Sequence, residues 1–334
     1  MPFPLTPEIE FALATVRTAS QLVAHVQREM VGGALTKDDS SPVTIADFAA
    51  QAFVGRALDE RFPHDPLVGE EDSRTLRADD QRETLKRVTF FISQYTPDAT
   101  PDTVCRWIDR GSAESAPRYW TVDPIDGTKG FLRGDQYAVA LALVENGVVQ
   151  LGVLGCPNLN IEFLLGGIGP MAAGPGALVV AVRGQGCWAA SLAGEDFARL
   201  HVSGRSDPAQ ARLLRSQEDA HTNTGKIGQL VTMLNVQAEP LGLDSQAKYA
   251  LLAAGRGDLL VRLISSKAPD YKEKIWDQGA GSIVVEEAGG RITDLHGQPL
   301  DFTQGRTLAR NRGVLASNGQ LHTAALEALA AIGA

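Results

Sequence analysis

The chain contains little cysteine, and its cysteines are far apart. Its 334 residues include only three, Cys105, Cys156 and Cys187. An odd number of distant cysteines offers neither a disulfide framework nor the paired spacing of a zinc site, and it is typical of a reducing compartment. The first residues also lack the basic start and apolar centre of a signal peptide. We therefore expect a cytoplasmic protein.

Long apolar runs and an excess of basic charge are also missing. No apolar run approaches the roughly 18–20 residues that a membrane-spanning helix needs, so we expect no membrane partner. The net charge of −9 leaves no evident basic surface to neutralise a polyanionic backbone, which argues against nucleic acid as a partner. A small anionic substrate is still compatible with this charge, because acids that hold divalent cations reverse the local field.

Length and residue pattern predict two packed lobes, which we place at residues 1–200 and 201–334. The chain exceeds the roughly 250–300 residues at which one hydrophobic core stops growing. Strand-like runs separated by turns favour an antiparallel meander, and they lie at 138–144, 148–154, 161–165 and 178–183. Helical patterns lie at 8–30, 47–62, 77–95, 227–234, 246–254, 282–287 and 320–332, with a further strand at 259–263. Segment 96–117, rich in Pro, Asp, Thr and Ser, predicts a surface loop.

The most informative segment covers residues 120–131 and reads Trp-Thr-Val-Asp-Pro-Ile-Asp-Gly-Thr-Lys-Gly-Phe. It predicts a strand, a turn and a helix that begins at Thr128. The turn would place the carboxylates of Asp123 and Asp126 and the carbonyl of Ile125 on one side. Such hard oxygen ligands suit Mg²⁺, and the backbone N–H groups of a helix start suit a phosphate. Metal and phosphate at one turn indicate phosphoryl chemistry.

Three further acidic residues stand where strands or helices are expected to begin or end. Glu70 follows a short apolar stretch, Asp277 precedes a helical run, and Asp47 leads into a helix. Each has a simpler interpretation. Asp47 and Asp277 could cap helices, Glu70 could lie in a solvated acidic loop, and the motif at 120–131 could be an ordinary turn.

Together and in this order, these segments resemble the lithium-sensitive phosphomonoesterases, the superfamily of inositol monophosphatase and fructose-1,6-bisphosphatase. The extension Lys-Gly-Phe-Leu-Arg-Gly at 129–134 and the motif Asp-Ser-Gln-Ala-Lys-Tyr at 244–249 more narrowly resemble the 3′(2′),5′-bisphosphate nucleotidases. The resemblance runs from about Ser40 to about Asn318. It implies an enzyme of sulfur metabolism that hydrolyses the 3′-phosphate of adenosine 3′,5′-bisphosphate (PAP), with its sulfated precursor PAPS as a second candidate substrate.

The same resemblance implies a fold and a site. The fold is α/β, a layered αβαβα sandwich with an α+β N-terminal lobe, an α/β C-terminal lobe and the active site between them. Two to three Mg²⁺ ions are implied, with the ligands Glu70, Asp123, the Ile125 carbonyl, Asp126 and Asp277. Asp47 and Thr128 are implied as the pair that activates water. Substrate contacts are implied for Thr128, His221, Ser245, Lys248, Arg262 and Asp277.

The sequence departs from the nucleotidase pattern at three places outside the metal ligands. The loop at 265–270 is longer, Gln278 stands where a histidine is usual, and a second histidine near His221 is missing. These departures concern substrate range, so an inositol monophosphate or bisphosphate phosphatase is an alternative. A PAP-binding sensor without turnover is another, although the complete set of acids argues against it. The sequence leaves the oligomeric state open, with a monomer as one option.

Overall fold

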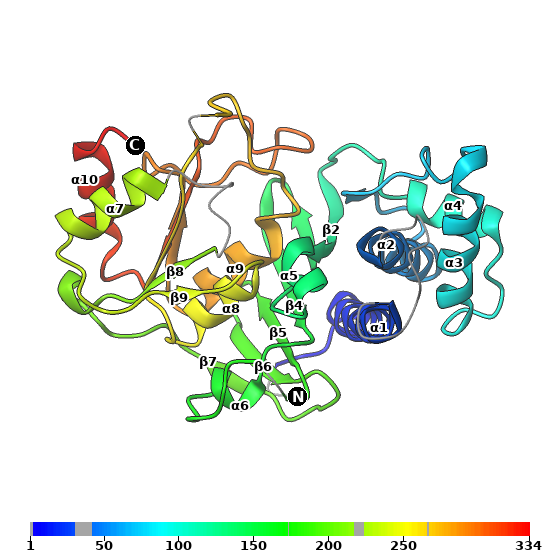
Figure 1. The fold of residues 1–334 in the computed structure, drawn as a ribbon, viewed down its shortest axis with the longest axis horizontal. Coiled ribbons are helices and arrows are strands. Elements are labelled where there is room, and N and C mark those ends of the chain that lie inside the picture. Colours follow the sequence, from blue (N-terminus) through cyan, green and yellow to red (C-terminus); the bar gives the residue numbers. More distant parts are fainter. Residues whose placement is uncertain (1–2, 31–41, 173, 217–223, 266) are drawn as a thin grey trace.

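The strands of the chain form two β-sheets, and helices cover both faces of each sheet (Figure 1). The structure is a computed structural model that describes residues 3–30, 42–172, 174–216, 224–265 and 267–334. None of the helices in these ranges is long and apolar enough to cross a membrane.

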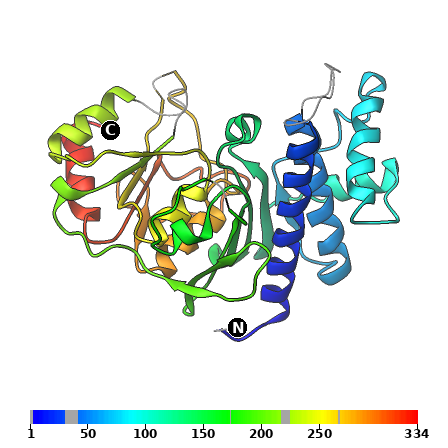
Figure 2. The ribbon, with the colours of Figure 1, turned by 60° about the horizontal axis from the view of Figure 1, so that its bottom comes forward.

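The first layer consists of N-terminal helices. They are α1 (Pro7–Met30), α2 (Pro42–Arg61), α3 (Arg82–Ser93) and α4 (Pro101–Asp109), with a short 3₁₀ turn at Asp79–Gln81. Helices α1 and α2 pack against each other and against the first sheet, and Figure 2 shows α1 lying along that sheet. Val16 and Leu22 of α1 and Leu58 of α2 are fully buried there.

The surface loop predicted at 96–117 is wrong, because this segment contains α4. Thr100 caps the helix: its Oγ1 accepts from the backbone N–H of Thr103 at 3.2 Å, while its own N–H donates to Oγ1 of Thr103 at 2.8 Å. Pro101 occupies the first turn, where no backbone donor is needed. Val104 and Trp107 are buried. The Pro, Asp and Thr that indicated a loop are the residues that begin this helix.

Helix α2 begins earlier than predicted. It starts at Pro42, so Asp47 lies inside the helix and the interpretation of Asp47 as a helix cap is wrong. The helix predicted at 77–95 is shorter and consists of the 3₁₀ turn and α3.

Seven strands of the described chain form the first sheet, in the order β1-β2-β3-β4-β5-β6-β7. Their bounds are β1 (Leu67–Gly69), β2 (Arg118–Asp126), β3 (Ala138–Glu145), β4 (Val148–Cys156), β5 (Ala177–Val182), β6 (Gly186–Ser191) and β7 (Ala198–Leu200). Strand β1 pairs in parallel with β2, and every later pairing is antiparallel. The predicted meander is therefore confirmed for β3, β4 and β5.

The strand predicted at 161–165 is wrong, because this segment is the short helix α6 (Ile161–Leu164). The side chain of Asn160 accepts a hydrogen bond from the backbone N–H of Glu162 at 3.0 Å. This cap favours a helical turn over an extended strand, although the sequence is apolar enough for either.

Another five strands within the described ranges form the second sheet, in the order β11-β12-β10-β8-β9. Their bounds are β8 (Leu213–Arg215), β9 (Leu241–Gly242), β10 (Leu259–Arg262), β11 (Arg291–Thr293) and β12 (Val314–Ser317). The helices around it are α7 (Thr224–Met233), α8 (Ala247–Ala253), α9 (Gly279–Glu287) and α10 (His322–Ala331), and a 3₁₀ turn spans Pro208–Gln210. Each helix overlaps a predicted one.

Three hydrophobic cores join five layers, in which helices and sheets alternate. The first core joins the N-terminal helices to the first sheet, the second joins both sheets through α8 and α9, and the third joins the second sheet to α7 and α10. Figure 1 shows this order from right to left. The predicted αβαβα sandwich is thus confirmed. Because the first sheet ends at Leu200 and the second begins at Leu213, we keep the division at 1–200 and 201–334 as a proposal.

Candidate active site

The two aspartates of the central motif lie at the irregular end of β2. The pairing of β2 with β3 shifts register between Asp123 and Asp126, so the strand bulges there. Gly127 follows with φ of +91°, and a Cβ at this position would lie 2.8 Å from Cβ of Ser245. Both the backbone and the space therefore require glycine. Thr128 then begins α5 (Thr128–Arg133), as predicted.

This turn forms one wall of a polar pocket of about 210 Å³. Every site residue predicted from the sequence lines it except Asp47 and His221, and these residues are Glu70, Asp123, Ile125, Asp126, Thr128, Ser245, Lys248, Arg262 and Asp277. They come from the end of β1, from β2, and from the start or end of α5, α8, α9 and β10. His221 lies outside the described residues.

Asp123 is the most deeply buried acid of the pocket. It is 2% exposed, and its Oδ1 has no hydrogen-bond partner. Burial raises the pKa of Asp123 well above its ordinary value, and the carboxylates of Glu70, Asp126 and Asp277 raise it further. Ionising this aspartate is therefore unfavourable unless positive charge lies nearby.

The other three acids share this environment. Burial raises the pKa of Glu70, the most exposed of the four, and the nearby Asp126 carboxylate adds to the shift. Burial also raises the pKa of Asp126, against the opposing charges of Lys248 and Arg262. The pKa of Asp277 is raised well above its ordinary value by burial, although Arg262 opposes this. Four acids that resist ionisation together need positive charge from elsewhere.

A divalent cation fits this donor set. Four carboxylates, one backbone carbonyl and the unpartnered Oδ1 of Asp123 are hard oxygen donors of the kind that Mg²⁺ prefers. Among the described residues, no three acidic, histidine or cysteine side chains already stand at metal-binding geometry. The metal is therefore inferred from the chemistry of the donors.

Asp47 lies on α2 and does not line the pocket. It is 6% exposed, and its Oδ1 has no hydrogen-bond partner. Burial raises the pKa of Asp47 well above its ordinary value, and the charges of Glu71 and Glu70 raise it further. Helix α2 packs against α5, which Thr128 begins. Asp47 is therefore an unpaired buried acid next to the cluster of carboxylates.

One turn further along α2, Gln51 was missed by the sequence reasoning. Its Oε1 accepts from the backbone N–H of Glu71 at 2.9 Å, and its Nε2 donates to the carbonyl of Glu71 at 2.5 Å and to that of Ile108 at 2.9 Å. Gln51 thus fixes the acidic loop to the helix that carries Asp47. Its spacing of four residues from Asp47, on the same helix face, was the available signal.

Two cations stand opposite the acids. Lys248 is 3% exposed, and its Nζ donates to Oγ of Ser216 at 3.2 Å and to the carbonyl of Leu243 at 3.3 Å. Burial lowers the pKa of Lys248 to about 8, although the Asp126 carboxylate opposes the shift. Arg262 follows on β10 and also lines the pocket.

The start of α8 supports the acidic turn. The backbone N–H of Gln246 donates to Oδ2 of Asp126 at 2.6 Å. Ser245 has a φ of +73° although it is not glycine, and its Oγ accepts from the N–H of Ala247 at 3.2 Å. A left-handed serine is strained, and such strain is common at functional sites.

Further lining residues were not singled out from the sequence. They are Lys129, Ser216, Asp244 and Tyr271. Lys129 belongs to the motif at 120–131 and Asp244 to the motif at 244–249, which could have indicated them. Tyr271 begins the run Tyr-Lys-Glu-Lys-Ile-Trp-Asp, which ends at Asp277. Ser216 follows β8 and has no motif around it.

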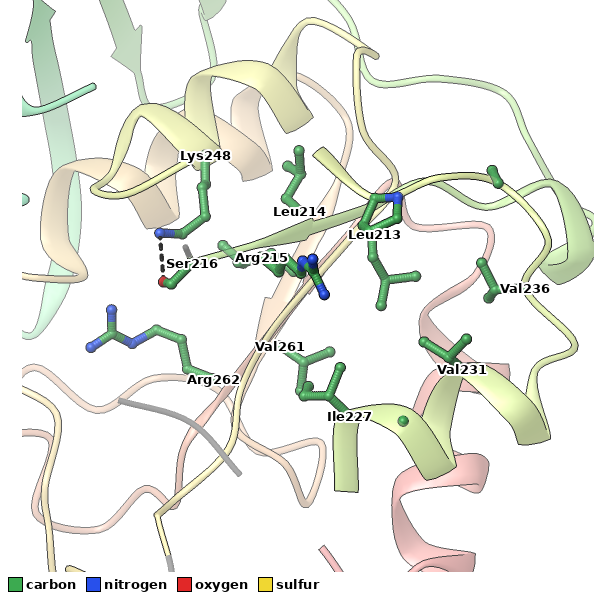
Figure 3. A pocket seen from close by; sticks show the side chains of 14 residues that line it. Leu213, Leu214, Arg215, Ser216, Ile227, Val231, Val236, Lys248, Val261 and Arg262 are labelled. Atoms are coloured by element: carbon green, nitrogen blue, oxygen red, sulfur yellow. Dashed lines mark hydrogen bonds between the residues drawn. The ribbon is translucent and has the colours of Figure 1, made fainter. Parts of the chain in front are cut away.

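A second, apolar cavity of about 400 Å³ adjoins the acidic pocket. Leucine, isoleucine and valine side chains from β8, β10 and α7 line it, as Figure 3 shows. Ser216, Lys248 and Arg262 line both spaces. In Figure 3 they stand at one end of the apolar cavity. The site therefore consists of an acidic part and an apolar part, with two cations at their junction.

A model of the inositol monophosphatase family matches residues 5–334. The chain belongs to the inositol monophosphatase family. A curated relative from Schizosaccharomyces pombe, named 3′(2′),5′-bisphosphate nucleotidase, is 41% identical over 97% of this chain and 95% of its own length. A relative of the same name from Oryza sativa is 40% identical over 98% of this chain and 94% of its own length. The resemblance to the nucleotidases is thus confirmed.

Solved structures of the inositol monophosphatase family share the fold. The inositol monophosphatase from Anabaena gives a TM-score of 0.62 at 20% identity, covering 96% of this chain and 94% of its own. The IMPase of Thermotoga maritima gives 0.63 at 21% identity, covering 98% of each chain. At these identities the likeness concerns the fold alone. The roles of individual site residues in this family member stay predictions.

Proposed function

We propose that the chain is a Mg²⁺-dependent 3′(2′),5′-bisphosphate nucleotidase that hydrolyses the 3′-phosphate of PAP to AMP and phosphate, and that also accepts PAPS. The adjoining acidic and apolar pockets carry this proposal, because Lys248 and Arg262 stand at their junction. A nucleoside bisphosphate has a matching layout: an apolar base, a phosphate to be cleaved and a second phosphate that needs a cation. The names of the curated relatives support the same activity.

The acids of the pocket would hold the metal. The proposed ligands are Glu70, Asp123, the Ile125 carbonyl, Asp126 and Asp277. When bound, two to three Mg²⁺ ions would neutralise phosphate charge and lower the pKa of the attacking water. Asp123 would be the central ligand, because it is the most deeply buried of these acids and the charges of four other carboxylates raise its pKa.

Asp47 and Thr128 are the proposed water-activating pair. Thr128 stands at the pocket wall, where its hydroxyl can orient a water and pass a proton on. Asp47 can accept that proton, because its Oδ1 has no other partner and its pKa is raised by burial. The water oxygen bonds to phosphorus as the bond from phosphorus to the 3′-oxygen breaks. That oxygen takes up a proton from solvent and leaves as the ribose hydroxyl, and Asp47 returns its proton to solvent. No covalent enzyme intermediate is required.

The second phosphate is assigned to the two cations. Lys248 and Arg262 can each make charge-assisted contacts to it, and Ser245 can add a hydrogen bond. The apolar cavity would then receive the base. A contact from His221 is part of the proposal, although this residue lies outside the described ranges.

We also propose a cytoplasmic location. All three cysteines are buried and unpaired. Unpaired thiols are typical of proteins in a reducing compartment.

The test is a comparison of substrates with Mg²⁺. Phosphate release would be measured from PAP, PAPS, inositol 1-phosphate, inositol 1,4-bisphosphate and fructose 1,6-bisphosphate, with chelator as the control. We expect the highest kcat/KM for PAP and no activity in excess chelator. A higher kcat/KM for an inositol phosphate would overturn the proposed substrate, and full activity in chelator would overturn the metal.

A further inference from the structure

Arg262 is shared between two carboxylates through one nitrogen. Its Nη2 lies 2.9 Å from Oε2 of Glu273 and 3.6 Å from Oδ2 of Asp277. Among the described residues, Nη2 makes the shortest recorded contact to each of these two carboxylates. Arg262 lines both pockets, and in Figure 3 its guanidinium stands at the same end of the apolar cavity as Lys248. Which carboxylate holds Nη2 therefore affects both pockets.

A buried chain of hydrogen bonds fixes the Glu273 carboxylate. Nε2 of Gln278 donates to Oε2 of Glu273 at 2.8 Å, the same oxygen that pairs with Arg262. The hydroxyl of Tyr249 donates in turn to Oε1 of Gln278. Glu273 is 5% exposed, Gln278 0% and Tyr249 2%. Buried groups with satisfied hydrogen bonds keep one geometry, so Glu273 presents its oxygen to Arg262 at a fixed place.

If Glu273 lost its charge, Asp277 would be the nearest carboxylate to Nη2. A guanidinium cannot shed its proton in a protein, so Arg262 would turn to this second acid. Asp277 would then be tied to an arginine, and the arginine would be drawn away from the phosphate. The distances of 2.9 Å and 3.6 Å show the present balance in favour of Glu273.

We propose that Glu273 is a positioning residue that keeps Arg262 off Asp277. Its carboxylate holds Nη2 of Arg262, which leaves Asp277 available to a cation and keeps the guanidinium at the junction of the two pockets, where it can meet an anion. Gln278 fixes Glu273 without carrying a charge of its own. The inference rests on the proposed function, because it takes Asp277 as a cation ligand.

The test measures Mn²⁺ binding to the metal-free full chain without substrate. The concentration of free Mn²⁺ is read from its electron paramagnetic resonance signal. Glu273→Gln should weaken Mn²⁺ binding about tenfold, which corresponds to ~1.4 kcal/mol. Adding Arg262→Gln should reverse this, so that the double variant binds Mn²⁺ within about twofold of Arg262→Gln alone, the usual limit for uncoupled sites. A residue that merely supports the fold would show no such rescue.

The matched control is Glu286→Gln on α9. Glu286 also pairs with an arginine, Arg183, at 2.7 Å, but it lines neither pocket. This variant should bind Mn²⁺ like the unmodified chain. If Glu273→Gln fails to fold in a thermal unfolding scan, Glu273→Asp keeps the charge but withdraws it from Arg262, and it should weaken Mn²⁺ binding with the same reversal.

Unchanged Mn²⁺ binding in Glu273→Gln, or a loss that Arg262→Gln does not reverse, would overturn the inference. Because no substrate is present, the result is separate from the proposed function. An unmodified chain that binds Mn²⁺ but releases no phosphate from PAP would refute the nucleotidase and leave this test intact.

Discussion

Replacing Lys248 by methionine should move stability and substrate binding in opposite directions. Lys248 is 3% exposed, and burial lowers its pKa from 10.5 to about 8 in spite of the nearby Asp126 carboxylate. At about 1.4 kcal/mol per pH unit, holding this lysine charged in the folded chain costs roughly 3 kcal/mol. Lys248→Met removes the charge and keeps an apolar side chain of similar length.

The net gain in stability should be smaller than that cost. Ser216 Oγ and the Leu243 carbonyl would lose their donor, which lies 3.2 Å and 3.3 Å away, at about 1 kcal/mol for each lost hydrogen bond. We expect Lys248→Met to raise the free energy of unfolding by about 1 kcal/mol at pH 7, measured by urea unfolding. Between pH of about 8 and 10.5 the unfolded chain binds more protons at Lys248 than the folded chain does. The unmodified chain should therefore gain stability with rising pH in this window, and the variant should lack that gain.

The same variant should bind PAP less well. A charge-assisted contact is worth roughly 1.5–3 kcal/mol, or about 10- to 150-fold in affinity. The kcat/KM for PAP should fall by that factor, whereas 3′-AMP, which has no 5′-phosphate, should be little affected. Equal losses on both substrates, together with lower stability, would refute the reasoning and make Lys248 a structural residue.

Three further predictions follow from buried groups. Asp47→Asn should lower kcat on the order of 10²- to 10⁴-fold while PAP still binds in calorimetry with metal present; a near-normal kcat would remove Asp47 from the mechanism. Asp123→Asn should abolish activity yet raise the melting temperature of the metal-free chain, because it relieves repulsion among buried carboxylates; a lower melting temperature would contradict this. Burial lowers the pKa of His322 to about 4 from 6.5, so the unfolded chain binds the proton first and stability should fall by roughly 3 kcal/mol as pH drops from about 6.5 to about 4. His322→Gln should flatten that part of the urea-unfolding profile against pH, and an unchanged slope would contradict the assignment.

The central motif could be predicted from sequence because its structure is local. A strand, a bulge, a left-handed glycine and a helix start follow one another within residues 118–133. Gly127 is needed for both its φ and its lack of a Cβ, so the residue type itself marks the turn. The layered sandwich is different, because its layers depend on packing between distant segments. Periodicity predicted the elements, and only the family resemblance predicted their layers.

The two wrong element predictions have different physical causes. At 161–165 the apolar sequence suits a strand as well as a helix, and the cap from Asn160 favours the helix. Helix α4 begins with the polar capping residue Thr100, a residue type that also favours loops. In α4 the cap is followed by a buried apolar face that includes Trp107. The composition of segment 96–117 therefore does not indicate α4, because the stability of this helix comes from the burial of its apolar face.

Arg306, which no acidic motif indicates, contacts segments from both halves of the chain that carry acids of the site. Arg306 donates to the carbonyl of Gly69, and its guanidinium lies 4.9 Å from the ring centroid of Trp276. Gly69 precedes Glu70, and Trp276 precedes Asp277. The Arg306 side chain therefore contacts both of the segments that carry these two carboxylates. A sequence motif can identify a metal ligand, because the residue type itself determines which metal it can bind. It does not give the spacing between ligands, because that spacing depends on contacts between distant segments, such as those that Arg306 makes with the Gly69 carbonyl and the Trp276 ring.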